Sequence, residues 1–347
     1  MKRTILLVSA ALAFAACTTD YTPDLTRAEG KVTLSFRSSM PVTKAPITGS
    51  GDLTLDHFQV FVFDASGTLE ANTGVIHDTD VASSLPSVEI SPGVKDIWAV
   101  GNAPEDITGN HVVNTLAQFL DIRMDLLDQT GGENLMYSAH IPETVVSEAY
   151  TVDLEFDHLA CKIIIDEIQR NFVNSDLALV PLSIQRIYLS NVAGDCDFAC
   201  AEAPEVWYNK KGAVEKTNSI IYYSFGSGGH VLSQGSSYTT SHVFYSFPNP
   251  QLEDHYAGNT WSPRRTRLVV ECLYNGETCY YPVTLPKAAS EKLKRNTVYH
   301  IQKLILKRPG SPDPDNPGDT YNPYMEYSFE VIVNGWQDDI PYTEEFS

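Results

Sequence analysis

The stretch KVTLSFRS, residues 31–38, predicts a short β-strand on which the rest of the fold depends. Val32, Leu34 and Phe36 alternate with polar residues, so one face of the strand is apolar and the other is polar. A strand of this kind packs its apolar face on the core of a sheet. Burial of the three side chains stabilises such a sheet by on the order of 5–9 kcal/mol, at about 1.5–3 kcal/mol for each.

The chain begins with the features of an export signal. Residues 1–3 carry two positive charges and residues 5–16 are apolar, a run too short to span a membrane as an ordinary helix. The run ends in FAAC at Cys17, which resembles a lipobox. We therefore predict a signal peptide over residues 1–16 and lipidation of Cys17. The alternative is an ordinary secretory signal that happens to be followed by a cysteine.

The strand at residues 31–38 lies between this anchor and a polar stretch, MPVTKA at residues 40–45, which contains the basic residue Lys44. A strand between an anchor and a cleavable linker is one that a protease can remove after folding. Two hypotheses therefore stand at this point. The strand is either a permanent part of the core or a temporary filler of it.

Composition excludes one class of partner. The chain of 347 residues has 24 Lys and Arg against 44 Asp and Glu, a net charge of −20. An acidic surface repels nucleic acid and anionic membranes, so we expect no nucleic-acid partner. The acidity is typical of a protein that must stay soluble outside the cell. The length suffices for two globular domains.

Short strand-like runs separated by turn signals recur along the chain and predict β-sandwiches. In LDHFQVFVF, residues 55–63, both faces of the strand are apolar, which predicts burial on both sides. Near-helical spacing predicts one helix over residues 115–128, and Pro286 opens a second that ends near Lys294. The expected fold is mostly β, with two sandwiches at residues 45–156 and 157–347 and one or two short helices.

Five cysteines follow Cys17. Cys272 and Cys279 flank the hairpin signal Asn275-Gly276, which places them opposite each other. A disulfide there is one outcome, although a hydrogen-bonded facing pair suits disulfide geometry poorly.

The other cysteines are Cys161, Cys196 and Cys200. Cys196 and Cys200 are close enough in sequence to bridge across a loop. Cys161 lies in an apolar run and is predicted to be a buried thiol. The chain has no CxxC pair, so we expect no zinc site.

No constellation of catalytic residues is apparent. The chain contains no GxSxG, HExxH, P-loop or GxGxxG motif, and its nine histidines are scattered. We therefore expect neither an enzyme nor a cofactor. A weaker hypothesis is a glycan-binding platform of aromatic side chains. Its candidate residues are Tyr222, Tyr223, Tyr238, Phe244, Tyr245 and Phe247.

Taken together, these features resemble the fimbrillin family, the subunits of type V pili of Bacteroides-like bacteria. The resemblance covers nearly the whole chain, and it depends on the order and spacing of its parts. Besides Cys17, the strand at 31–38 and the Lys44-Ala45 pair, these parts are LDHFQVFVF at 55–63, HLACKIIIDEI at 158–168, KRNTVYHIQKLIL at 294–306 and YSFEVIVNGW at 327–336.

The resemblance implies two transthyretin-like sandwiches and export to the outer membrane as a lipoprotein. It also implies cleavage after a basic residue, here between Lys44 and Ala45, where family members often have Arg. Cleavage would release residues 17–44, with the strand that carries Val32, Leu34 and Phe36. The mature form would then stand on the cell surface in fimbriae and support adhesion.

The resemblance further implies that a C-terminal segment of a neighbouring subunit fills the vacated place. Tyr327, Phe329, Val331 and Val333 share one parity, at the same two-residue period as the removable strand. The Pro- and Asp-rich residues 308–323 before them are predicted to be an extended linker that gives this donor its reach. The simpler alternative is that the segment pairs within its own domain.

The expected partners are other copies of the chain or related pilus subunits, the outer membrane through the lipid, a processing protease, and an unidentified ligand on a host or bacterial surface. Two alternatives remain open. One is an outer-membrane lipoprotein that binds glycans. The other is an anchor or tip subunit of the pilus that is not polymerised.

Overall fold

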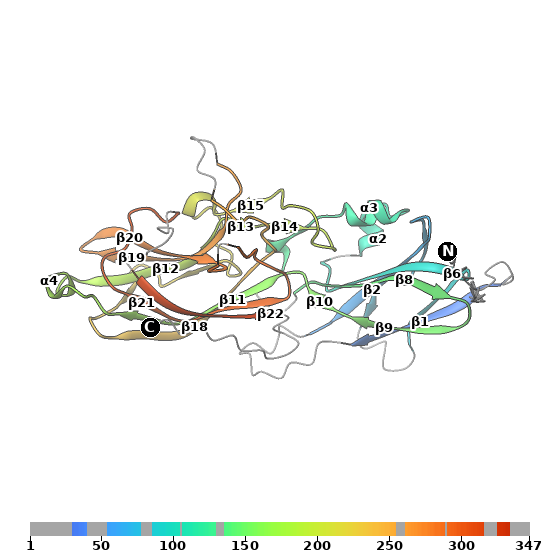
Figure 1. The fold of residues 1–347 in the computed structure, drawn as a ribbon, viewed down its shortest axis with the longest axis horizontal. Coiled ribbons are helices and arrows are strands. Elements are labelled where there is room, and N and C mark those ends of the chain that lie inside the picture. The colour runs from blue at the N-terminus through green and yellow to red at the C-terminus, as the bar shows by residue number, and fades with distance from the viewer. Residues whose placement is uncertain are drawn as a thin grey trace, which may run out of the picture.

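The computed structural model describes residues 30–39, 54–77, 85–104, 106–129, 135–254, 261–288, 290–315 and 325–333. Two lobes of β-structure lie end to end along the long axis of the molecule (Figure 1). The prediction of a mostly β fold built as two sandwiches is confirmed. No helix among the described residues is long and apolar enough to cross a membrane.

The N-terminal lobe pairs a large sheet with a small one. The large sheet has the order β10-β8-β6-β2-β3, with β4 also paired to β2, and the small sheet has the order β5-β1-β9. The strands of the large sheet are β2 (His57–Asp64), β3 (Leu69–Asn72), β4 (Ile76–His77), β6 (Gly93–Gly101), β8 (Tyr137–Val146) and β10 (Asp157–His158). Those of the small sheet are β1 (Val32–Ser39), β5 (Ser87–Ile90) and β9 (Tyr150–Glu155).

The C-terminal lobe contains two main sheets. The first has the strand order β18-β11-β21-β22, and the second has the order β16-β12-β19-β20, with β17 also paired to β12. The strands of the first sheet are β11 (Cys161–Arg170), β18 (Ser237–Ser246), β21 (Thr297–Leu306) and β22 (Met325–Val333). Those of the second are β12 (Leu182–Ser190), β16 (Tyr222–Ser224), β17 (His230–Val231), β19 (Thr266–Tyr274) and β20 (Glu277–Leu285). Two-residue strands form two further pairs, β13 (Val192–Ala193) with β15 (Trp207–Tyr208), and β7 (Met124–Asp125) with β14 (Asp195–Cys196).

Strand β2 is buried on both faces, as its sequence predicts. Phe58 and Val60 belong to one apolar cluster, which contains the side chains of β1. Phe61 and Phe63 belong to a second cluster, which continues into the C-terminal lobe. The large sheet therefore separates two hydrophobic cores.

The helices of the described residues are short: α2 (Ile107–Asn110), α3 (Leu116–Leu120) and α4 (Ser175–Ala178), with 3₁₀ turns at Leu126–Asp128 and Lys210–Gly212. The single helix predicted over residues 115–128 is wrong. Thr115 caps α3 by accepting from the Gln118 amide, but the helix ends at Leu120. The following β7 pairs with β14 of the other lobe, and this tertiary pairing outweighs the local helical pattern.

The helix predicted from Pro286 to Lys294 is also wrong for the residues described there, which form bends and a turn. Leu293 is instead held in an isolated bridge with Asn249. The amide of each donates to the carbonyl of the other, at 3.0 and 3.1 Å. In a helix, the Leu293 amide would instead donate to the carbonyl four residues earlier.

The hairpin prediction is confirmed. Asn275 and Gly276 both have positive φ, 53° and 81°, which is the geometry of a type I′ turn. Cys272 consequently faces Cys279 across β19 and β20. Cys161 is buried as predicted. It and the other cysteines of the described residues are free thiols, so neither candidate disulfide is present.

The two lobes are joined by charged hydrogen bonds. Arg295, which precedes β21, donates through Nε to the His158 carbonyl at 3.1 Å. Its Nη2 donates to the Asp157 carbonyl and to Ser138 Oγ, each at 3.0 Å. Asn296 Nδ2 reaches Asp157 Oδ1 at 2.6 Å. A C-terminal segment therefore holds the last strands of the N-terminal lobe.

Replacement of Arg295 by Met should weaken this junction, because Met keeps much of the apolar stem but removes every donor. A hydrogen bond to a charged group contributes about 1.5–3 kcal/mol, so we expect the free energy of unfolding in urea to fall by about 2–3 kcal/mol. The control is Lys294→Met, since that side chain is exposed. Equal stability of the two variants would contradict the role given to Arg295.

Candidate strand-exchange site

Strand β1 is the middle strand of the small sheet. It pairs antiparallel with β5, from Val32 opposite Ile90 to Ser35 opposite Ser87. Along its other edge it pairs parallel with β9, over six residue pairs. Strands β5 and β9 have no other partner strand within the described residues. Removal of β1 would therefore leave an open edge on each side of its place.

The apolar face of β1 points into the core of the N-terminal lobe. Leu34 and Phe36 are 0% exposed, whereas Val32 is only half-buried and packs at the margin of the cluster. The prediction that three side chains of β1 are buried is therefore confirmed for Leu34 and Phe36 and only in part for Val32. Their burial stabilises the sandwich by about 3–6 kcal/mol, less than the value for three.

The polar side chains along β1 contribute little to the free energy that keeps this strand in its sheet. Arg37 forms an ion pair with Asp153 of β9 at 3.0 Å, and both side chains are more than half exposed. Lys31 lies 4.0 Å from Glu89 of β5, and this pair is exposed as well. Exposed ion pairs contribute about 0–1 kcal/mol. Strand β1 is therefore held by its backbone ladders and its apolar face.

The core that β1 completes is separate from the larger core of the molecule. The first cluster lies between the two sheets of the N-terminal lobe and includes Val60 of β2, Ile97 of β6 and Leu154 of β9. The second contains Phe61, packs under α3 through Phe119, and continues into the C-terminal lobe. Loss of β1 would therefore open the first cluster and leave the second enclosed.

Strand β5 is tied to the large sheet by an interaction that does not involve β1. Glu70 of β3 accepts from Lys95 Nζ of β6 at 2.5 Å and from the backbone amide of Ser91, which follows β5. Burial of Glu70 favours its neutral form, but these hydrogen bonds outweigh burial, and the pKa of its carboxyl lies below its ordinary value. No sequence pattern singled out these three residues, because their contact depends on the strand order.

The proposed donor strand is paired within its own lobe. Strand β22 lies antiparallel to β21 at the edge of its sheet, with Val333 opposite Thr297 and Met325 opposite Leu306. This is the pairing that the simpler alternative predicts. The side chains of the four predicted donor residues lie outside the description, as do Cys17 and the Lys44-Ala45 bond in their entirety.

The aromatic residues considered for glycan binding do not form one platform. Phe244, Tyr245 and Phe247 are buried in the core and cannot stack on a sugar. Tyr223 is exposed, but its ring packs against His242 at a centroid distance of 4.2 Å. Tyr238 is half-buried, and its hydroxyl forms a hydrogen bond with His242 Nε2 at 2.9 Å. Among the described residues, no three His, Cys, Asp or Glu are grouped as metal ligands.

Replacement of Leu34 by Ala should lower the free energy of unfolding of the N-terminal lobe by about 2–5 kcal/mol, because it leaves a cavity in a closed core. Hydrogen exchange of the β6 amides in increasing urea measures this loss, since Ile97 of β6 belongs to the same cluster as Leu34. The matched control is Thr33→Ala, whose side chain is exposed on the same strand. Similar losses in both variants would show that the apolar face of β1 does not carry the stability.

The contribution of Glu70 should depend on pH. Because its folded-state pKa is lowered, its stabilisation is complete above the ordinary carboxyl value and is lost as the pH falls through the folded value. Wild type should exceed Glu70→Gln in unfolding free energy by about 1–2 kcal/mol at pH 7, and the difference should vanish in acid. The exposed Glu89→Gln variant should show only a small difference at pH 7. A Glu70 difference that is constant with pH would exclude the charged interaction.

No protein-family model and no curated protein matches the sequence. The fold, in contrast, matches solved structures over most of their length. The fimbrilin FimA of Porphyromonas gingivalis aligns with a TM-score of 0.58 at 14% identity, covering 91% of this chain and 99% of that one. The tip fimbrial protein Mfa3 of the same species, with its C-terminus truncated, aligns with a TM-score of 0.53 at 13% identity, covering 87% and 99%.

A candidate cell adhesion protein of Bacteroides eggerthii aligns with a TM-score of 0.60 at 16% identity, covering 88% of this chain and 96% of that one. Identities this low establish the fold and leave the function to be argued from the site. The fold of this chain is that of the fimbrillins.

Proposed function

We propose that the chain is a structural subunit of a cell-surface fimbria, assembled by removal of β1 and its replacement with the C-terminal strand of a neighbouring subunit. The observation that carries this proposal is the place of β1 in the middle of its sheet. An edge strand could be lost without creating a site. Loss of a middle strand leaves unpaired backbone groups on both sides and an apolar floor between them, which invites addition of a strand.

The C-terminal strand suits the role of donor. Strand β22 lies at the edge of its sheet, so its departure breaks one ladder, the ladder with β21. Its sequence places Tyr327, Phe329, Val331 and Val333 on one face, at the spacing of Val32, Leu34 and Phe36. A strand with this pattern supplies apolar side chains at the period that the vacated core requires.

The proposed maturation begins with lipidation of Cys17 and transfer to the outer membrane. A protease that cuts after basic residues then cleaves between Lys44 and Ala45, and β1 leaves with residues 17–44. The partners are other copies of the chain or related pilus subunits. Solved proteins of this fold include fimbrial and adhesion proteins, which favours a structural role over an enzymatic one.

The test treats the folded protein with trypsin and follows its mass and its size. We expect cleavage after Lys44, loss of β1 and growth of oligomers. Lys44→Gln should abolish both cleavage and assembly. The matched control is Lys287→Gln, since Lys287 is an exposed basic residue outside the propeptide. Cleavage at Lys44 that never yields oligomers, even with accessory factors, would refute assembly by strand exchange.

The N-terminal residue of protein recovered from the cell surface separates this proposal from its rivals. Ala45 would indicate a polymerised subunit. Acylated Cys17 would instead indicate a pilus anchor or a surface lipoprotein that binds glycans. A glycan array would then distinguish the last two, with Tyr223→Ala as the variant, because Tyr223 is the exposed member of the aromatic group.

A further inference from the structure

The first part of the predicted linker is built into the C-terminal lobe. Ser311 is buried and forms an isolated bridge with Tyr280 of β20, in which each amide donates to the other carbonyl at 2.8 Å. The Tyr281 hydroxyl donates to the Arg308 carbonyl, also at 2.8 Å. Pro314 lies so close to Gly212 that a Cβ there would approach it to 2.4 Å. The expectation of a free linker is therefore wrong for residues 308–315.

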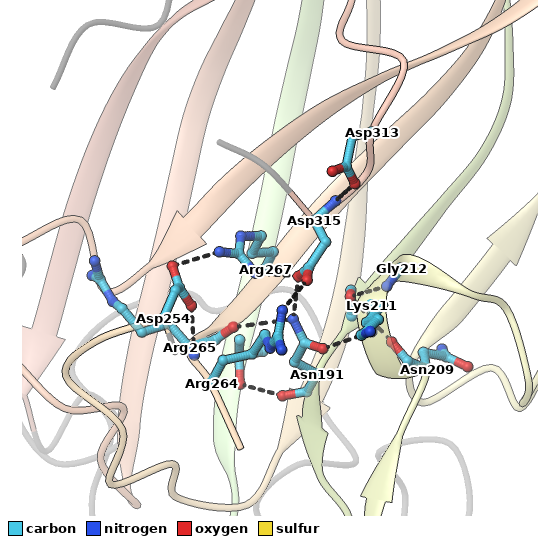
Figure 2. A network of polar contacts seen from close by, with 12 residues as sticks. Asn191, Asn209, Lys211, Gly212, Asp254, Arg264, Arg265, Arg267, Asp313 and Asp315 are labelled. Atoms are coloured by element: carbon cyan, nitrogen blue, oxygen red, sulfur yellow. Dashed lines mark hydrogen bonds and ion pairs between the residues drawn. The ribbon is translucent and has the colours of Figure 1, made fainter. Parts of the chain in front are cut away.

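Asp315 is the last residue described in this stretch, and it is held by two buried arginines (Figure 2). Its Oδ2 accepts from Arg264 Nη1 at 2.6 Å, and its Oδ1 accepts from Arg267 Nη1 at 2.5 Å. Asn191 Nδ2 also donates to Oδ1, at 2.7 Å. The arginine side chains are 2% and 0% exposed and that of Asp315 is 6% exposed. Charges buried this deeply are costly to separate, because either partner alone would lack compensation.

A second carboxylate completes the charge balance. Asp254 Oδ2 accepts from Arg267 Nη2 at 2.5 Å, and its Oδ1 accepts from the Arg265 amide at 3.1 Å. Arg264 and Arg267 thus face Asp315 and Asp254, two positive charges against two negative charges. Buried charged hydrogen bonds of this kind restrict the side chains that form them, so they hold the backbone at Asp315 in place.

The partners of Asp315 belong to the other side of the sandwich from β22. Arg267 lies in β19, Arg264 just before it, and Asn191 between β12 and β13. None of the three lies in the sheet that contains β21 and β22. Departure of β22 would therefore leave every one of these contacts to Asp315 in place.

We propose that Asp315 is a positioning residue that fixes where the exchangeable C-terminal segment begins. The inference rests on the proposed function. Residues up to Asp315 stay with their own subunit, and only the chain beyond it moves to the neighbour. Nine residues separate Asp315 from β22, and the ten steps from Asp315 to Met325 span at most about 35 Å when fully extended. If the whole segment after the end of β21 were free, the donor strand would reach about twice as far.

The short tether has a consequence for the partner. It confines the donor strand to a small volume around its own lobe, which raises its effective concentration at a neighbour docked within range and excludes neighbours beyond it. Asp315 would thereby select adjacent, closely docked subunits as acceptors. It would do so without touching the acceptor itself.

The test uses hydrogen exchange of the full-length monomer, so it does not depend on assembly. Val331→Pro removes a backbone N–H from β22 and restricts φ to about −65°, away from the extended geometry of the ladder with β21, so it should speed exchange of residues 325–333 at least tenfold. The Ser311 amide should keep its wild-type rate. In Val331→Pro/Asp315→Asn, the Ser311 amide should also exchange at least tenfold faster, since the neutral amide no longer balances the arginines.

The matched control is Val331→Pro/Asp313→Asn. Asp313 is exposed, and its Oδ1, which accepts from the Asp315 amide at 2.9 Å, is retained in Asn. Ser311 should stay protected in this variant. Amides of β11 report global opening, and in the Asp315 double variant the Ser311 amide should accelerate more than they do. If the Ser311 and β11 amides accelerate by the same factor, Asp315 has only a structural role and the positioning proposal fails.

A second measurement covers the case in which a proline variant does not fold. Native-state exchange of the wild-type protein in low urea should show β22 opening at lower free energy than Ser311. A single opening of both, or loss of Ser311 protection with Val331→Pro alone, would overturn the proposal. Absence of polymers after trypsin would instead bear only on the proposed function. In any polymer that does form, Ser311 should exchange as it does in the monomer.

Discussion

The hydrogen bonding of one strand along both of its edges is the constraint on which this structure depends. Strand β1 supplies the ladder partners of β5 and β9, and it covers the inner face of the large sheet with Leu34 and Phe36. Backbone groups in a dry sheet must be paired, so this place has to be occupied by some strand. The requirement is for a strand of suitable pattern, and it does not specify which chain provides it.

The remainder of the molecule has supports that do not depend on β1. Because the large sheet separates two apolar clusters, disturbance of the first need not reach the second. The Glu70 contacts hold β5 against the large sheet, and Arg295 and Asn296 hold the lobes together. Stability is thus distributed unevenly, with β1 set in a framework that keeps its own supports.

Much of this fold follows from local sequence patterns. Alternation predicts β1, two apolar faces predict the buried position of β2, and Asn275-Gly276 predicts the β19–β20 hairpin. Contacts between distant residues leave no such pattern. The helix predicted at 115–128 is interrupted by pairing with β14, about 70 residues later, and Asp315 meets Arg267 from 48 residues away. A segment rich in Pro and Asp therefore resembled a solvated linker although part of it is buried.

The mixed pairing of β1 gives the site a polarity. Its longer ladder, the six residue pairs with β9, is parallel, whereas its four pairs with β5 are antiparallel. Parallel ladders are slightly less stable per residue than antiparallel ones. A replacement strand that entered in the opposite direction would turn the longer ladder antiparallel and the shorter one parallel. Strand β1 therefore occupies the less favourable of the two orientations, and in the proposed exchange an incoming strand of opposite direction would gain stability from the sheet geometry alone.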